Sequence, residues 1–153
     1  MILTAVAGLS LSTAGPAAAA TIEPGTWRPY GATNPPTSGT SIWNCTGELR
    51  ITDDQLVTGR VCVIRTPNGE HFQGAVIIRN DRSSLYGTEV AFMMETYDDG
   101  DYDIRWVCPR SGVGAHSWSV CFGRTLWWPI TFSTARVRES GANGVNLGPS
   151  PWG

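Results

Sequence analysis

The chain has 153 residues, which suits a single domain, and its formal net charge of −2 provides no basic field for nucleic acid. Nucleic acid is therefore not expected as a partner. All 11 basic residues are arginine, a bias that GC-rich coding produces and that indicates a bacterial source of the actinobacterial kind.

The first twenty residues, 1–20, carry no charged side chain and predict a signal peptide. An apolar stretch, Ile2–Leu11, is followed by the small-residue cleavage pattern Ala18–Ala20, so the mature chain is expected to begin at Thr21. A membrane anchor is the alternative, but a span needs about 20 mostly apolar residues and this run is shorter. We therefore expect a secreted protein without membrane attachment.

The segment Thr21–Thr40 is poor in apolar residues and predicts an extended N-terminal arm rather than a domain. Proline cannot donate to a strand ladder and favours extended conformations. The prolines of this segment are Pro24, Pro29, Pro35 and Pro36. Trp27 and Tyr30, with Arg28 between them, are the expected partner-binding residues of the arm, since aromatic and arginine side chains anchor interfaces.

From Ser41 the residues alternate in the way that predicts β-strands separated by turns. The expected strands are Ser41–Thr46, Glu48–Thr52, Gln55–Arg65, His71–Asn80, Tyr86–Tyr97, Tyr102–Cys108, Ser117–Phe122 and Thr125–Arg138. Asn68-Gly69 predicts a hairpin, Gly59 a bulge, and Val76–Ile78 a central strand buried on both faces. Pro109–Gly114 is expected to be a loop.

The regular spacing of these strands favours an all-β fold, a small antiparallel β-sandwich or barrel over residues 41–153. Its C-terminal tail, Gly141–Gly153, is rich in glycine and proline. No stretch shows a helical stripe.

The four cysteines of an exported chain predict two disulfides. Three pairings are possible, and the two pairs that are local in sequence, Cys45–Cys62 and Cys108–Cys121, are preferred. A zinc site is disfavoured because the spacings lack the C-x2-C pattern. No cofactor is expected.

The residues do not predict an enzyme. The two histidines, His71 and His116, accompany no G-x-S-x-G or H-E-x-x-H motif. Glu48, Glu89 and Glu95 lie in expected strands, but nothing pairs two of them for glycoside hydrolysis.

The acidic loop Asp98–Asp103 suggests a calcium site at first sight. Asp99 opens an EF-hand register, but this register places Ile104 where glycine is required and Arg110 where a bidentate acid is required. A solvated hairpin turn is the better interpretation, and no metal is expected.

Seven tryptophans give the chain many candidate contacts. Trp43, Trp106 and Trp118 are expected to pack on the disulfides in the core. The neighbours Trp127 and Trp128 point to opposite faces of a strand, so one of them is expected to be exposed and available to a sugar or a protein. Trp27 belongs to the arm and Trp152 to the tail. For both residues, contact with a partner and packing on the domain remain alternative expectations.

Three segments, Cys45–Gly47, Gly59–Val63 and His71–Asn80, resemble the small adaptor subunit of umbrella toxin particles, which are secreted antagonism complexes of actinobacteria. The resemblance implies a non-enzymatic bridge between a large toxin chain and lectin-bearing partners, and a docking role for the arm. Size, export and cysteine number are also shared with the subtilisin-inhibitor-like group, whose reactive-loop pattern is not found here.

Three functions therefore follow as expectations. The first is a secreted adaptor or protein-binding module whose partners are other secreted proteins. The second is a protease inhibitor, which needs a rigid exposed loop such as Pro109–Ser117 beside Cys108. The third is a carbohydrate-binding or hydrolytic protein, which needs an aromatic platform beside polar side chains.

Overall fold

The computed structural model describes residues 22–35, 39–96, 104–127, 130–139 and 143–151, and the regular elements in these ranges are all β-strands. They are β1 (Ile22–Pro24), β2 (Thr26–Gly31), β3 (Ile42–Cys45), β4 (Leu49–Arg50), β5 (Val57–Arg65), β6 (Phe72–Asn80), β7 (Tyr86–Thr96), β8 (Ile104–Val113), β9 (Ser117–Phe122), β10 (Ile130–Glu139) and β11 (Val145–Pro149).

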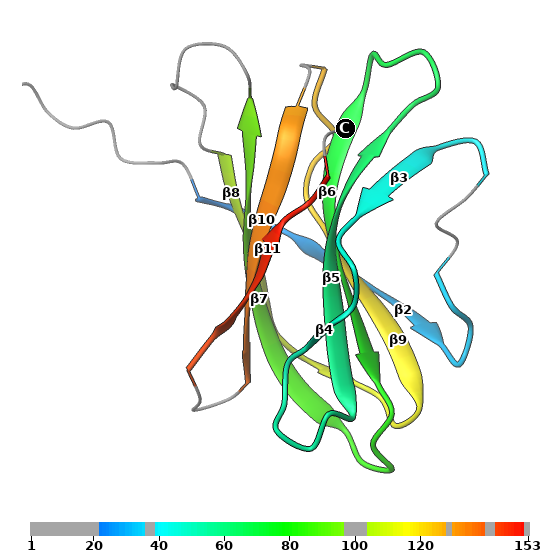
Figure 1. Ribbon diagram of the computed structural model, residues 1–153, viewed down its shortest axis with the longest axis vertical. Helices are drawn as coiled ribbons and strands as arrows, with labels where there is room; N and C mark the ends of the chain where they lie inside the picture. Colours follow the sequence, from blue (N-terminus) through cyan, green and yellow to red (C-terminus); the bar gives the residue numbers. More distant parts are fainter. Residues whose placement is uncertain (1–21, 36–38, 97–103, 128–129, 140–142, 152–153) are drawn as a thin grey trace, which may run out of the picture.

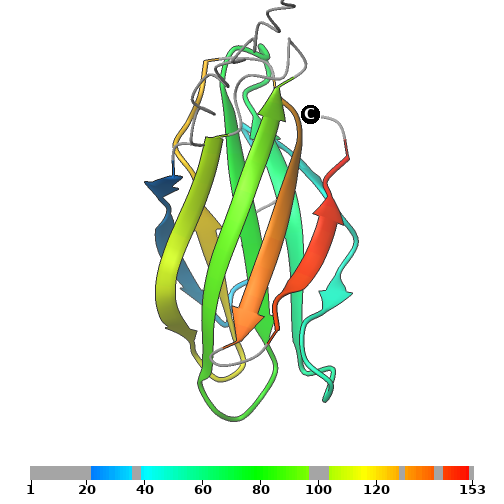
Figure 2. The same ribbon diagram turned by 90° about the vertical axis from the view of Figure 1, so that its left-hand side faces the viewer.

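The strands form two sheets that face each other as a sandwich (Figure 1). One sheet has the order β1-β8-β7-β10-β11, and Figure 2 shows it from its outer side. The other has the order β2-β9-β6-β5-β3, with β4 also paired to β5. The predicted all-β class is confirmed, and of the two expected architectures the sandwich is the one adopted.

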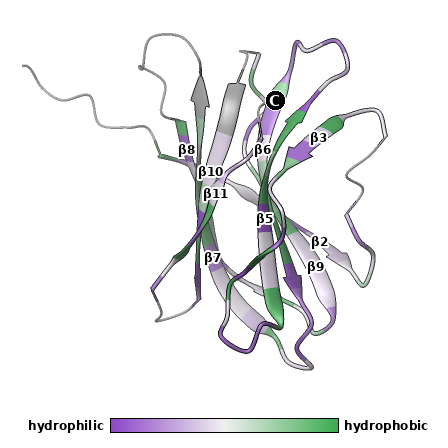
Figure 3. Ribbon diagram, in the orientation of Figure 1, coloured by the Kyte–Doolittle hydropathy of each residue, from purple (hydrophilic) through white to green (hydrophobic). Residues whose placement is uncertain are grey.

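The core lies on both sides of β6, as its apolar run predicts. Val76 and Ile78 point into the space between the sheets, while Ala75 and Ile77 point to the outer side, and all four are almost inaccessible to water. Figure 3 shows that β6 ends in a hydrophilic arrowhead, where the apolar stretch gives way to Arg79 and Asn80.

The hairpin between β5 and β6 forms as expected, with Arg65 opposite Phe72. Its turn is closed by a hydrogen bond of 2.9 Å from the Gly69 N–H to the Thr66 carbonyl. The predicted bulge at Gly59 is wrong, because the β5–β6 register runs through this residue without a shift. Glycine is required there by close packing, since an added Cβ would lie 2.7 Å from Ile51 Cδ1.

The predicted loop Pro109–Gly114 is also wrong, because β8 continues to Val113 opposite Tyr86 of β7. The register of this pair shifts between Thr88 and Val90, so two residues of β8 oppose one residue of β7 near Pro109. A bulge tolerates proline, which has no N–H to give to the ladder. The proline therefore marks an irregularity within a strand and not its end.

The predicted arm contributes two strands to the domain instead of lying apart from it. β1 pairs in parallel with β8 of one sheet, and β2 pairs antiparallel with β9 of the other. The chain crosses between the sheets at Gly25. The domain boundary expected at residue 41 is therefore corrected, since strands of the sandwich begin at Ile22.

Both predicted disulfides are confirmed. Cys45–Cys62 joins the neighbouring strands β3 and β5, with a Cα–Cα distance of 4.0 Å. Cys108–Cys121 joins β8 to β9 and therefore ties the two sheets together, with both cysteines fully buried in the core between them.

Gly25→Ala is expected to destabilise the fold, because an added Cβ would lie 2.6 Å from Cys108 Sγ and 3.1 Å from the Phe122 carbonyl. Overpacking of this kind costs about 1–3 kcal/mol. Gly47→Ala is the matched control, since nothing lies within 4 Å of its added Cβ. Urea unfolding of both variants measures the difference, and equal stabilities would contradict the close approach at Gly25.

Candidate functional site

The outer side of the six-stranded sheet carries an apolar surface where a sandwich ordinarily presents polar side chains to water. Its floor is formed by Cys62, Ile64, Ala75, Ile77 and Val120, all buried. Half-buried aromatic residues cover this floor, and we call them the aromatic face: Tyr30, Trp43, Trp118 and Phe122.

The aromatic face extends across the sheet, because Trp43 comes from the edge strand β3 and Phe122 from β9. Their ring centroids are 6.1 Å apart in an edge-to-face arrangement. Two strands, β5 and β6, separate their backbones in the sheet order, so the rings meet above those strands. Ala75 of β6 is completely buried beneath this cover.

Arginines accompany the aromatic rings at the other end of the face. The Arg28 guanidinium lies 5.2 Å from the centre of the Tyr30 ring, and that of Arg79 lies 5.1 Å from Trp118. Arg79 also forms an ion pair of 2.9 Å with Asp81. A guanidinium beside an aromatic ring can still bind a carboxylate through its N–H groups, as that of Arg79 binds Asp81.

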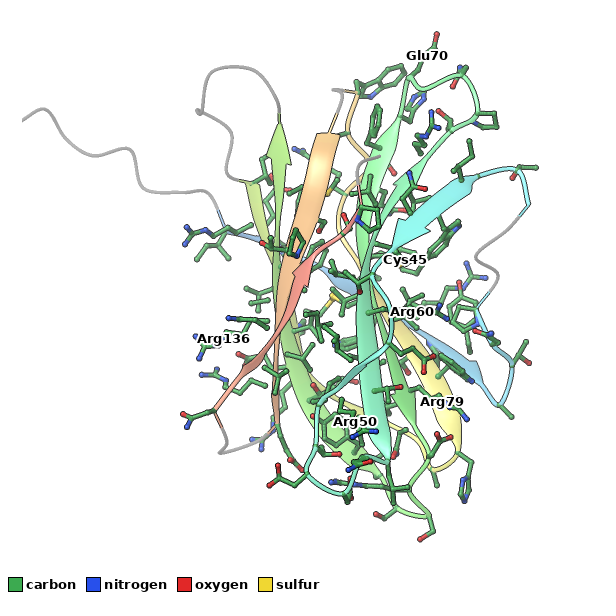
Figure 4. The ribbon with its side chains drawn as sticks, in the orientation of Figure 1. Cys45, Arg50, Arg60, Glu70, Arg79 and Arg136 are labelled. Atoms are coloured by element: carbon green, nitrogen blue, oxygen red, sulfur yellow. A yellow bond between two sulfur atoms is a disulfide. The ribbon has the colours of Figure 1, made fainter. Side chains whose placement is uncertain are left out.

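Arg60 lies opposite Ile77 in the β5–β6 pair and shares the outward side of β5 with Cys62. Figure 4 places Arg60 and Arg79 on the side of the sheet that faces away from the five-stranded sheet. The Nε atom of Arg60 is buried and has no hydrogen-bond acceptor among the described residues.

The predicted partner-binding residues Trp27, Arg28 and Tyr30 do not share one surface, because successive side chains of β2 point to opposite sides. Trp27 packs against the core between the sheets, and its Nε1–H donates a hydrogen bond of 2.8 Å to the Pro109 carbonyl. Arg28 is exposed and lies with Tyr30 at the edge of the aromatic face.

Trp43 and Trp118 were expected in the core, but they belong to the outer surface of the six-stranded sheet. The sequence contains a signal for Trp118. If Cys121 faces inward to reach Cys108, alternation along β9 turns Trp118, Val120 and Phe122 outward. The expected core position is confirmed for Trp106, which is fully buried and stacked on Phe92 at 5.5 Å.

A second surface feature lies on the outer side of the five-stranded sheet. It is a hollow of about 530 Å³. Ala91 of β7 stands between Arg136 of β10 and Val107 of β8 in the cross-strand register, so its small side chain leaves the hollow between longer neighbours. Ile22 of β1, which is 66% exposed, lines one side.

The two histidines do not form a common site. His71 precedes β6, whereas His116 precedes β9, whose Ser117 is paired with Asn80 at the far end of β6. His71 instead lies against Trp127, with ring centroids 4.0 Å apart. His116 has a φ of 48° in the short β8–β9 connection, where its N–H donates to the Arg82 carbonyl at 3.1 Å.

No group of His, Cys, Asp or Glu side chains that could hold a metal ion occurs in the described ranges. In the same part of the chain there is no helix of the length and hydropathy that a membrane span requires. The predicted signal peptide 1–20, the acidic loop Asp98–Asp103, Trp128 and Trp152 lie outside the described residues.

No protein-family model, no curated protein sequence and no solved structure matches this chain.

Asp54 and Arg82 fasten the turn after β4 to the turn after β6. The Arg82 Nε–H donates to Asp54 Oδ2 at 2.7 Å, and its Nη1–H donates to Glu139 Oε1 at 3.4 Å. Hydrogen bonds from the Thr52 hydroxyl, Arg82 and the Leu56 N–H lower the pKa of Asp54 from 3.8 to about 2. This carboxylate is solvated and paired within the fold, so its role is structural.

The stability of the fold is expected to decrease as the pH falls through the range from 3.8 to about 2. The folded-state pKa of Asp54 is depressed, so its contribution is present above the unfolded pKa and is lost on protonation. Asp54→Asn should lower the melting temperature at about pH 6, and its difference from the wild type should shrink toward about pH 2. Thermal melts across this range test the prediction, with the exposed Asp53→Asn as control. Parallel wild-type and Asp54→Asn curves would contradict it.

Proposed function

We propose that this chain is a secreted, non-catalytic protein-binding module that docks on another secreted protein through the aromatic face. The observation that carries the proposal is the set of half-buried aromatic side chains on the outer side of the six-stranded sheet. Tyrosine, tryptophan and arginine are enriched among the residues that contribute most binding energy at protein interfaces. Trp118 with Arg79, and Tyr30 with Arg28, supply this combination.

In this proposal only part of the predicted arm takes part in docking. Its Arg28 and Tyr30 lie at the edge of the aromatic face, whereas Trp27 supports the fold. β2 is an edge strand, and Pro29 within it disfavours the addition of a partner strand. We therefore propose docking through side chains of the face.

A bridging role, as in the adaptor subunits that the sequence resembles, requires a second surface for a second secreted protein. The hollow around Ala91 and Arg136 is suited to it, because it lies on the opposite outer side of the sandwich. Two partners bound on opposite sides would be held apart by the thickness of both sheets. A toxin chain and a lectin-bearing chain are the proposed partners.

Carbohydrate binding is the second candidate function, supported by Trp127. This side chain is 73% exposed, and its ring lies tilted against that of His71, with the ring centroids 4.0 Å apart. His71 is close in sequence to the hydrogen-bonded pair Asn68 and Glu70. An aromatic platform with nearby polar groups is what a sugar-binding site needs. The inhibitor alternative has less support, because Pro109–Val113 is part of β8.

Trp118→Ala and Tyr30→Ala are expected to weaken partner binding at least tenfold each, because interface aromatics contribute about 2 kcal/mol or more. Mature protein would be immobilised and exposed to the native culture supernatant, and captured proteins quantified by mass spectrometry. The dissociation constant of each purified partner is then measured by calorimetry for every variant. A partner that binds wild type and both variants equally would refute docking through this face.

Trp127→Ala is the matched control, since it removes an exposed tryptophan outside the aromatic face. It should leave protein binding unchanged. If Trp127→Ala abolishes binding to immobilised glycans while Trp118→Ala does not, the result supports carbohydrate binding as a function of this chain.

Trp27→Ala should lower the melting temperature, because it removes core packing and the hydrogen bond to Pro109. A loss of about 3–5 kcal/mol is typical of buried tryptophan, and half burial places this residue toward the lower end. Calorimetric melting measures the effect. An unchanged melting temperature together with lost partner binding would instead make Trp27 a direct anchor.

A further inference from the structure

The aromatic face has an uneven charge distribution. Three arginines, Arg28, Arg60 and Arg79, lie on it. Arg79 forms an ion pair with the acidic residue Asp81. Among the described residues, Arg28 and Arg60 have no ion-pair partner. The chain as a whole is negative, at −2, so this positive surface is a local feature.

The strand register gives the spacing of the two unpaired arginines. Arg28 lies opposite Val120, Val120 opposite Ile77, and Ile77 opposite Arg60. These four residues form one row across β2, β9, β6 and β5. Neighbouring strands are about 4.8 Å apart, so the backbones at the two ends of the row are about 14 Å apart. Two cationic groups therefore flank the aromatic side chains that cover Val120 and Ile77.

An extended peptide matches this row in length and periodicity. Its alternate side chains point the same way, and residues i and i+4 are about 13 Å apart. Acidic side chains at i and i+4 would reach Arg28 and Arg60, and an apolar side chain at i+2 would lie against the aromatic side chains that cover Val120 and Ile77. Carboxylates fit guanidinium groups through paired hydrogen bonds.

Arg60 provides an independent indication of an acceptor at one end of the row. Its Nε is buried without a hydrogen-bond acceptor among the described residues. Buried polar groups in native proteins are nearly always hydrogen-bonded. Because this atom is covered in the free protein, a carboxylate can accept a hydrogen bond from it only if the Arg60 side chain turns toward the face when the ligand binds.

We infer that the aromatic face binds an extended acidic segment of the partner, which crosses the strands with carboxylates on Arg28 and Arg60 and an apolar side chain between them. This inference rests on the proposed function, because it identifies what the docking surface recognises. It adds a sequence pattern for the ligand: acidic at i, apolar at i+2 and acidic at i+4.

The test uses the mature protein and a fluorescein-labelled heptapeptide, Ser-Glu-Thr-Leu-Thr-Glu-Ser, as probe. Fluorescence anisotropy should show binding that weakens as salt is raised. A peptide with lysine in place of both glutamates should bind at least tenfold more weakly. A peptide of the same composition with adjacent glutamates should also lose affinity, because it cannot reach both arginines.

Arg60→Met and Arg28→Met keep an apolar stem and remove the charge, so each should weaken probe binding about tenfold while the melting temperature stays within a few degrees. Arg60→Lys should retain part of the affinity. Arg110→Met is the control, since Arg110 is an exposed arginine of β8 in the other sheet.

Equal binding of the glutamate and lysine peptides, no binding of the probe, or unchanged affinity in both arginine variants would overturn the inference. Its failure is distinguishable from that of the proposed function. If captured partner protein is lost with Trp118→Ala but retained with both arginine variants, docking through the face stands and acidic recognition falls. If Trp118→Ala retains the partner, docking through the face falls as well.

Discussion

The need to keep both sides of β6 from water is the constraint on which the rest of the structure depends. The opposite sheet of a sandwich covers only the inner side, where Val76 and Ile78 lie. Ala75 and Ile77 on the outer side are equally buried and require cover from neighbouring strands. Aromatic side chains of β2, β3 and β9 provide this cover. In doing so they become a partly exposed aromatic surface, and the core and the proposed docking surface therefore have the same origin.

The two edges of the sandwich are closed by chain segments that approach more closely than a side chain would permit. At one edge the N-terminal strands pass from sheet to sheet, and Gly25 lies against the sulfur of Cys108. At the other edge Leu147 of β11 and Ile51 converge above Gly59 of β5. A small domain gains stability from such closure, since its core is limited and its disulfides restrict the unfolded chain.

Local signals in the sequence were sufficient for much of the fold. Both disulfides join cysteines that are near in sequence, and the buried central strand follows from the apolar run Val76–Ile78. The strands of Thr21–Thr40 were not predicted, because their partners are far away in the chain and proline suggested an arm. The prediction of a loop at Pro109–Gly114 was wrong for a related reason, because a bulge in β8 accommodates the proline. The outward position of Trp118 can be predicted only after Cys121 has been assigned to the inner side of β9, because alternate residues of a strand share a side.

The register of β2 decides which side chains a partner meets. Trp27 points inward to the Pro109 carbonyl, while Arg28 and Tyr30 point outward. If β2 slipped by one residue along β9, these directions would be reversed, and a guanidinium would lie in the core and an indole on the surface. Gly25 opposes that slip, because it is the residue that fits against the Cys108–Cys121 sulfurs, and each neighbour in the chain carries a side chain. The disulfide that ties the sheets together thereby also fixes the composition of the proposed docking surface.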